Sequence, residues 1–103
     1  MQINNTSLQL ISGRLGLDPK LAYTKKGEPV CEMSVGLVNE QSETIWRKVV
    51  VFGKLAELCS VHLRKGNEVF MRGRMELKRF INKDGIEKEY FELKALSVGQ
   101  SLL

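Results

Sequence analysis

Apolar and polar residues alternate along much of the chain with the two-residue period of a β-strand. The alternation is clearest from Val30 to Val38 and from Val69 to Phe80. Leu8 to Arg14, Thr44 to Gly53 and Glu87 to Val98 are further predicted strands, separated by short polar or Gly-containing segments typical of turns and hairpins. The pattern therefore predicts five strands.

One segment has a different period. From Lys54 to Lys65, Leu55, Leu58 and Cys59 recur at helical spacing, and Gly66 follows where a helix commonly ends. A single helix between the third and fourth of five strands is the order of the oligonucleotide-binding barrel. The predicted fold class is therefore all-β with one short helix, in a five-stranded oligonucleotide-binding (OB-fold) barrel.

The length and composition fit one folded domain. The chain has 103 residues, which leaves no room for a second core of useful size. Of these residues 43% are hydrophobic and 27% charged, a balance that can bury one core and keep the protein soluble. No repeat or linker interrupts it. We expect a single domain over residues 1–103, with its core at about residues 8–98.

Charge and targeting features narrow the range of partners. The net charge of +4 and the pI near 9.2 favour anionic partners, either nucleic acid or an acidic membrane surface. No apolar run is long enough to cross a bilayer, and Met1 to Ser12 lacks the pattern of a secretory signal. We therefore expect a cytoplasmic protein that does not act at a membrane.

The chain offers few residues for catalysis or metal binding. Cys31 and Cys59 lie far apart among apolar residues, which favours buried reduced thiols over a zinc site or a disulfide. His62 is the only histidine, and no paired acid and base or activated nucleophile emerges. We expect no enzyme activity, no metal and no cofactor.

The segment from Val69 to Phe80 has two faces of different chemistry. Val69, Met71, Gly73, Met75 and Leu77 suit a barrel interior. The opposite face carries Phe70, Arg72, Arg74, Lys78 and Phe80, with Glu76 interrupting the series. Aromatic rings stack on bases of any identity, and Arg and Lys neutralise phosphates. This face therefore predicts a surface for single-stranded nucleic acid.

The third predicted strand repeats the combination less clearly. Trp46, Lys48 and Phe52 share one face with Val50, whereas the other face carries Ile45, Arg47, Val49 and Val51. Both faces are largely apolar, so the orientation of this strand stays open. The alternative to a binding role is that the aromatic side chains form cross-strand pairs or fill the core.

Four segments, together with Tyr23, resemble the bacterial single-stranded DNA-binding protein family. The segments are Gly13 to Pro19, Trp46 to Glu57, Leu63 to Gly66 and Gly73-Arg74, and the most specific is Trp46 to Glu57. The resemblance extends over about residues 8–98. It implies an oligonucleotide-binding barrel, usually a homotetramer, that coats single strands during replication, recombination and repair.

The resemblance also assigns roles to individual residues. Trp46 and Phe52 stand where the family has base-stacking aromatics, and Phe80 stands where it commonly has a stacking tryptophan. The face that they share with Lys48, Arg72, Arg74 and Lys78 would bind phosphates, and it is more basic than usual for the family.

Three departures from the family pattern affect what the resemblance implies. The connection from Val38 to Thr44 is shortened, which removes a hairpin that often carries a further stacking tryptophan. Arg47 replaces a histidine tied to tetramer assembly, so we expect a homo-oligomer that is either a dimer or a tetramer. The chain stops at Gln100 to Leu103 without the family's acidic tail, so docking of partner proteins through such a tail is not expected.

The leading hypothesis is a short single-stranded DNA-binding protein that binds without sequence preference. A close alternative is a replication-restart factor like primosomal replication protein N, which is also a short barrel. A third interpretation is a protein-assembly module, in which the aromatic side chains form subunit interfaces. RNA binding also stays open, because stacking and phosphate contacts do not read the 2′-hydroxyl.

Overall fold

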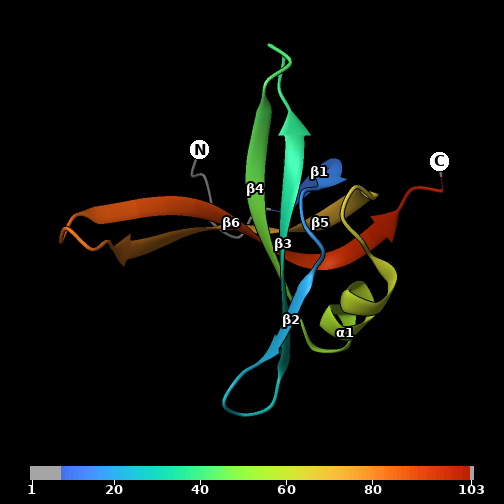
Figure 1. Cartoon of the computed structure of the whole chain (residues 1–103), viewed down its shortest axis with the longest axis horizontal. Coiled ribbons are helices and arrows are strands. Elements are labelled where there is room, and N and C mark those ends of the chain that lie inside the picture. The colour runs from blue at the N-terminus through green and yellow to red at the C-terminus, as the bar shows by residue number, and fades with distance from the viewer. Residues whose placement is uncertain (1–7, 103) are drawn as a thin grey trace.

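The computed structural model describes residues 8–102, which form strands and one helix. Residues 1–7 and 103 lie outside the described residues. The predictions for a domain over residues 1–103, for Met1 to Ser12 and for Gln100 to Leu103 therefore fall partly outside the described range. The elements in chain order are β1 (Leu8–Leu15), β2 (Lys20–Tyr23), β3 (Pro29–Val38), β4 (Thr44–Phe52), α1 (Gly53–His62), β5 (Glu68–Ile81) and β6 (Glu87–Gln100), shown in Figure 1.

Five of the strands close into a ring. The sheet runs β1, β5, β6, β4, β3, and β3 pairs back onto β1 through Arg14 opposite Gly36 and Leu15 opposite Val35. Among the strands of residues 8–102, only the β4–β6 pair is parallel. The ring confirms the predicted five-stranded barrel. β2 is an additional strand on the edge of β3, and at four residues it is too short for its alternation to be recognised in the sequence.

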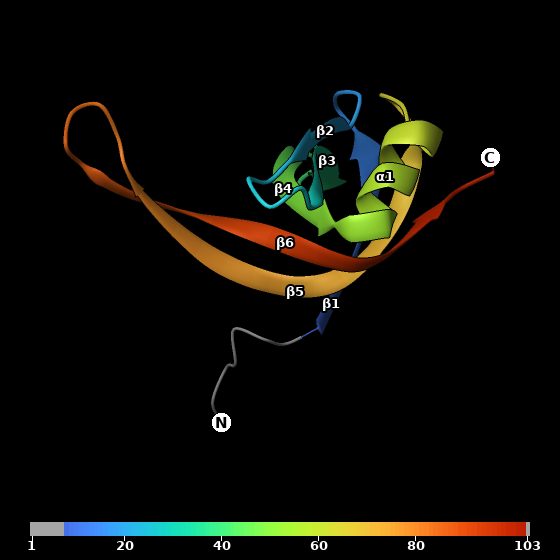
Figure 2. The same cartoon turned by 90° about the horizontal axis from the view of Figure 1, so that it is seen from below.

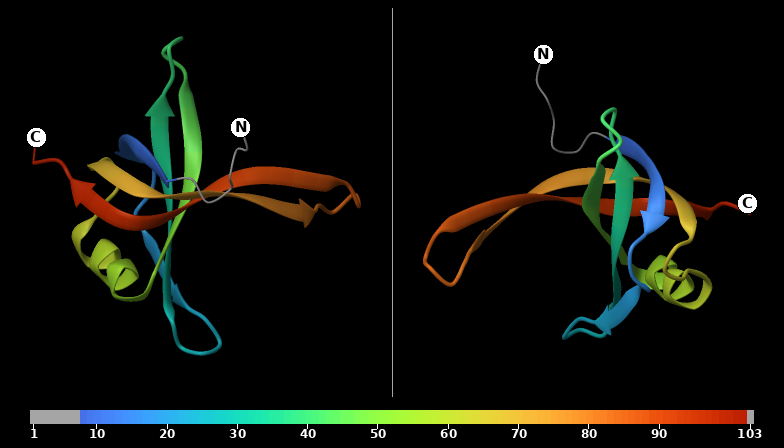
Figure 3. Two further views of the ribbon diagram at one scale, coloured as in Figure 1. Left: turned by 180° about the vertical axis from the view of Figure 1, so that it is seen from behind. Right: turned by 45° about the horizontal axis from the view of Figure 1, so that its top comes forward.

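Two hairpins extend beyond the ring. β5 and β6, each 14 residues long, continue as a curved two-stranded arm, and the end of the β3–β4 hairpin projects in another direction (Figures 1 and 2). Views from behind and from above show the same arrangement (Figure 3). The prediction that Leu77 points into the core is therefore wrong, because it lies on the arm and is 36% exposed.

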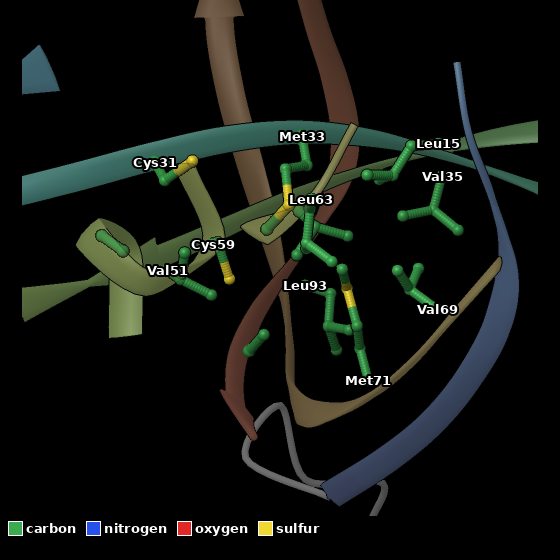
Figure 4. Packing of buried hydrophobic residues seen from close by; sticks show 13 residues of the cluster. Leu15, Cys31, Met33, Val35, Val51, Cys59, Leu63, Val69, Met71 and Leu93 are labelled. Atoms are coloured by element: carbon green, nitrogen blue, oxygen red, sulfur yellow. The ribbon is translucent and has the colours of Figure 1, made fainter. Parts of the chain in front are cut away.

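The core lies inside the ring and settles the orientation of β4. Val49 and Val51 are fully buried together with Met71 of β5 and Leu93 of β6, and Figure 4 shows such side chains converging from separate strands. α1 packs against this cluster through Ala56 and Cys59. The odd-numbered side of β4 is thus the interior face, so its even-numbered side chains point outward.

Both cysteines are free and buried, as predicted. Burial raises the pKa of the Cys31 thiol, and the charge of Glu32 adds to this effect. Burial also raises the pKa of Cys59 to about 11, with a further contribution from Cys31. Both thiols therefore stay protonated at neutral pH, so they act as small apolar core residues rather than nucleophiles.

The helix ends before the predicted boundary. The pattern predicted Lys54 to Lys65, whereas α1 ends at His62. The following residues bond to the first strand and its loop instead. The Gly66 N–H donates to the Leu15 carbonyl oxygen at 2.8 Å, and the Lys65 N–H donates to Asp18 Oδ1 at 2.7 Å. These tertiary hydrogen bonds replace the last helical turn.

Gly73 is required where β5 bends across β6. A side chain at this position would overlap the backbone carbonyl of Lys94, next to a register shift between Arg72 and Gly73. We therefore expect Gly73→Ala to lower the free energy of unfolding by about 1–3 kcal/mol, the usual cost of overpacking, as measured by urea denaturation.

Gly99→Ala is the matched control for this substitution on the same strand pair. A Cβ at Gly99 would find its nearest neighbour, the Phe70 carbonyl oxygen, at 3.9 Å. This variant should change the unfolding free energy by less than about 0.5 kcal/mol. Equal stabilities for the two variants would contradict the proposed close approach.

Candidate nucleic-acid interface

The ring places side chains from four strands on one continuous outer face. Residues that pair across a ladder point to the same side of a sheet, so the registers of β3, β4, β6 and β5 define rows across it. One row consists of Ser34, Lys48, Glu92 and Glu76, and the next consists of Glu32, Val50, Lys94 and Arg74. Residues far apart in the chain therefore share one wall.

Most of the predicted site residues lie on this outer face. Trp46 is 58% exposed and Phe80 is 48% exposed, whereas Phe52 is half-buried. The side chains of Lys48 and Lys78 are each about two-fifths exposed, and Arg74 is exposed. None of these side chains is sealed in the core, so each can reach a ligand from solvent.

Phe70 lies apart from this group, whereas Arg72 is two positions from Arg74 on the same outward side of β5. Both Phe70 and Arg72 are exposed, and in the ladder to β1 Phe70 pairs with Ser12, Arg72 with Leu10 and Arg74 with Leu8. Ten residues of extended strand, about 33 Å, separate Phe70 from the Phe80 end. The structure therefore places Phe70 near the opposite end of β5 from Phe80.

Trp46 rests on a floor made of two glycines. A Cβ on Gly16 would lie 2.5 Å from Cζ3 and 2.8 Å from Cη2 of the indole, and a Cβ on Gly36 would lie 3.0 Å from Cζ3. The indole therefore lies so close to the backbone at both positions that a side chain at position 16 or 36 would crowd it. This support holds the indole in place while it stays exposed.

Tyr90 is a residue of this face that the sequence analysis did not identify. It lies opposite Lys78 in the β5–β6 ladder, and its ring contacts Phe80 edge to face with centroids 5.8 Å apart. The Lys48 ammonium lies 5.2 Å from the Tyr90 centroid. The alternation along β6 is the sequence signal that could have identified Tyr90. It places Tyr90 on one side of the strand together with Lys88, Glu92 and Lys94.

Two hollows meet at Lys48. One has a volume of about 740 Å³ and lies between the loop at Leu17 to Pro19 and the outer side of β3. The other, of about 750 Å³, lies beside Phe80 and Tyr90. Lys48 lines both, so a continuous path runs from the β1–β2 loop to the base of the β5–β6 arm.

The two lysines at the centre of this path are paired with carboxylates. Lys48 Nζ lies 3.7 Å from Glu92 Oε1 and 3.8 Å from Glu32 Oε1. Lys78 Nζ lies 3.8 Å from Glu92 Oε2 and 3.8 Å from Glu76 Oε2. Of these acids only Glu76 was singled out from the sequence, because the pairs depend on the register between distant strands.

These charges act on the ionisation of Lys48. Burial lowers the pKa of its ammonium group, but Glu32, Tyr90 and Glu92 raise that pKa and together outweigh the burial. The net pKa lies above the ordinary value. Lys48 therefore carries its positive charge throughout the neutral range.

The odd-numbered side of the arm presents a second, apolar surface. Leu77 and Phe91, which pair across the arm, are 36% and 53% exposed, and the Arg47 guanidinium of β4 lies 5.9 Å from the Phe91 ring centroid. Ile45, on the same side of β4 as Arg47, is 44% exposed. The buried Nε of Arg47 has no hydrogen-bond partner among the described residues. A buried donor without an acceptor is costly.

Within residues 8–102, no group of three or more His, Cys, Asp or Glu side chains is arranged to hold a metal ion. No helix in the same range combines the length and the apolar character needed to span a bilayer.

Comparison with known proteins places this geometry in context. Residues 4–100 match the model of the Single-strand binding protein family. The Single-stranded DNA-binding protein of Neisseria meningitidis serogroup A is 33% identical over 94 residues, covering 84% of this chain and 54% of that protein. The protein of the same name from Xanthomonas campestris pv. campestris is 34% identical over 87 residues, covering 77% and 51%. The chain spans about half the length of these relatives.

The glycine floor beneath Trp46 can be tested in the free protein. Gly16→Ala should force the indole off its floor, because the added methyl group would overlap the ring. Trp46 is the only tryptophan, so its fluorescence emission should shift to longer wavelength while the circular dichroism spectrum stays unchanged. Gly99→Ala serves as control, and an unshifted spectrum in the Gly16 variant would contradict the described packing.

Proposed function

Because the chain belongs to the single-strand binding protein family, we propose that it binds single-stranded DNA without sequence preference and without catalysis. It stacks bases on exposed rings and neutralises phosphates, in DNA replication, recombination or repair. The observation that carries this proposal is the outer face on which exposed Trp46 and Phe80 flank basic side chains. Reduced buried thiols fit the cytoplasm as the compartment.

Base stacking supplies most of the affinity in this proposal. Trp46 has one side against the glycine floor and is still 58% exposed, so a base can lie on its open side without the ring moving. Phe80 is steadied by its edge contact with Tyr90. Each stacked base contributes about 1–3 kcal/mol, whatever its identity.

Phosphate neutralisation comes first from the basic residues that have no acidic partner. Arg72, Arg74 and Lys94 are exposed and form no salt bridge within the described part of the chain. The Lys94 ammonium lies 4.9 Å from the Phe52 centroid, which puts a cation beside a ring that can stack. Such contacts do not read base identity or the 2′-hydroxyl, so RNA is a second substrate to compare.

We further propose that the chain forms a homo-oligomer through its odd-numbered apolar surface, as a dimer or a tetramer. Leu77 and Phe91 are exposed on the side of the arm opposite the outer face, and Ile45 is exposed on the odd-numbered side of β4. A second chain would cover these side chains and could offer an acceptor to Arg47 Nε, which has none among the described residues. In this proposal DNA binds to the outer face, and the subunits assemble through the odd-numbered apolar surface on the opposite side.

Alanine variants test the stacking proposal. Trp46→Ala and Phe80→Ala should each weaken binding to oligothymidine by about 5-fold to 150-fold, the equivalent of about 1–3 kcal/mol, as measured by fluorescence anisotropy of a labelled oligomer.

Tyr23→Ala is the matched control, because Tyr23 is also 58% exposed but lies at the end of β2, with the interior parity of that strand. It should change the affinity less than about twofold. Folded Trp46 and Phe80 variants with unchanged affinity would refute the stacking roles.

A charge at the centre of the apolar surface tests the assembly proposal. Phe91→Lys should dissociate the oligomer to a species of 11.7 kDa in sedimentation velocity, because an ammonium group beside the Arg47 guanidinium would be buried without a partner. Leu58→Lys, at a 43% exposed position on α1, should leave the mass unchanged. A wild-type chain that sediments as a monomer at every concentration would contradict the proposal.

A further inference from the structure

We propose that Glu92 is an internal competitor of DNA phosphate, which holds Lys48 and Lys78 until a bound strand displaces it. This inference rests on the proposed function and deepens it, because it assigns a role within the binding face to a residue that has not been given one. It concerns how tightly the protein binds rather than what it binds.

The position of Glu92 fits such a role. Its side chain is only 10% exposed, whereas those of Lys48 and Lys78 are 40% and 42% exposed. The carboxylate therefore lies beneath the two ammonium groups, with one oxygen directed to each. The ammonium groups remain reachable from solvent, so a phosphate can approach them from the side opposite Glu92.

The contacts are loose enough to be exchanged. Glu92 Oε1 lies 3.7 Å from Lys48 Nζ, and Glu92 Oε2 lies 3.8 Å from Lys78 Nζ. Both distances exceed the 2.7–3.2 Å range of a good hydrogen bond, so the lysines are attracted but not locked. Lys48 also lies over the Tyr90 ring, which keeps it on the face when the carboxylate is neutralised.

The local charge is acidic although the chain is basic. Glu32, Glu76 and Glu92 surround only Lys48 and Lys78, so this cluster carries one net negative charge. Glu76 is directly opposite Glu92 in the β5–β6 ladder, and like charges in that relation destabilise a sheet. Stabilisation of the fold therefore does not explain why Glu76 and Glu92 lie opposite each other.

The arrangement limits what the two lysines contribute to affinity. A phosphate that reaches Lys48 or Lys78 gains an ammonium partner but meets the charge of Glu92 beneath it. Counterions are also released less fully, because each lysine is already partly neutralised by carboxylates in the free protein. The protein should therefore bind more weakly, and with a shallower salt dependence, than its number of basic residues implies.

The test compares Glu92→Gln with the wild type in titrations of oligothymidine at several salt concentrations. Loss of the charge should tighten binding about threefold to tenfold. It should also steepen the slope of log affinity against log salt by up to about 0.7 for each of the two lysines. Glutamine keeps the size and polarity of the side chain, so the fold is expected to persist.

Glu87→Gln is the matched control. Glu87 lies on the same strand and pairs with Arg79 on the other side of the arm, so the substitution makes the same change in net charge away from the outer face. It should alter affinity less than about twofold. If Glu92→Gln proves unstable, Glu76→Gln tests the same idea at a carboxylate that is 41% exposed, with a smaller gain in the same direction.

The outcomes separate this inference from the proposed function. A wild-type protein that fails to bind oligothymidine overturns the proposed function, and the competitor role with it. A wild-type protein that binds, together with a folded Glu92→Gln variant of equal or weaker affinity, overturns the competitor role alone. Weaker binding in particular would show that Glu92 positions the lysines for phosphate instead.

Discussion

Closure of the five-stranded ring is the constraint on which the rest of the structure depends. Once β1, β5, β6, β4 and β3 are hydrogen-bonded in a circle, one side of every strand must fill the core and the other must face outward. Val49 and Met71 are fully buried for this reason, while Lys48 and Arg72 beside them in the chain lie on the outside. The exposed wall of rings and cations is thus a consequence of the same alternation that builds the core.

How much of the fold could be read from the sequence varied with the strength of this alternation. The strict pattern from Val69 to Phe80 predicted β5 and its outward face. β4 has three consecutive valines, Val49 to Val51, which are all buried, so only ring closure shows which of its sides faces the core. Leu77 and the end of α1 were misjudged because a projecting arm and tertiary hydrogen bonds leave no local pattern in the sequence.

The candidate site shows a similar division between what is local and what is not. Trp46 and Phe80 could be identified from residue type and strand position alone. The pairing of Lys48 with Glu92 could not, because it depends on a parallel register between β4 and β6, whose paired residues lie 44 positions apart in the chain. The resulting surface has aromatic rings along a path whose centre carries one net negative charge. The cations that form no salt bridge within residues 8–102, including Arg74, lie to one side of that centre.

The central claim is that unpaired bases lie against Trp46, and one titration tests it most directly. Because Trp46 is the only tryptophan, the intrinsic fluorescence of the unmodified protein reports on that ring. Addition of oligothymidine should quench the emission to a plateau, and added salt should restore it. Emission that stays constant while an independent assay shows the oligomer bound would contradict the account.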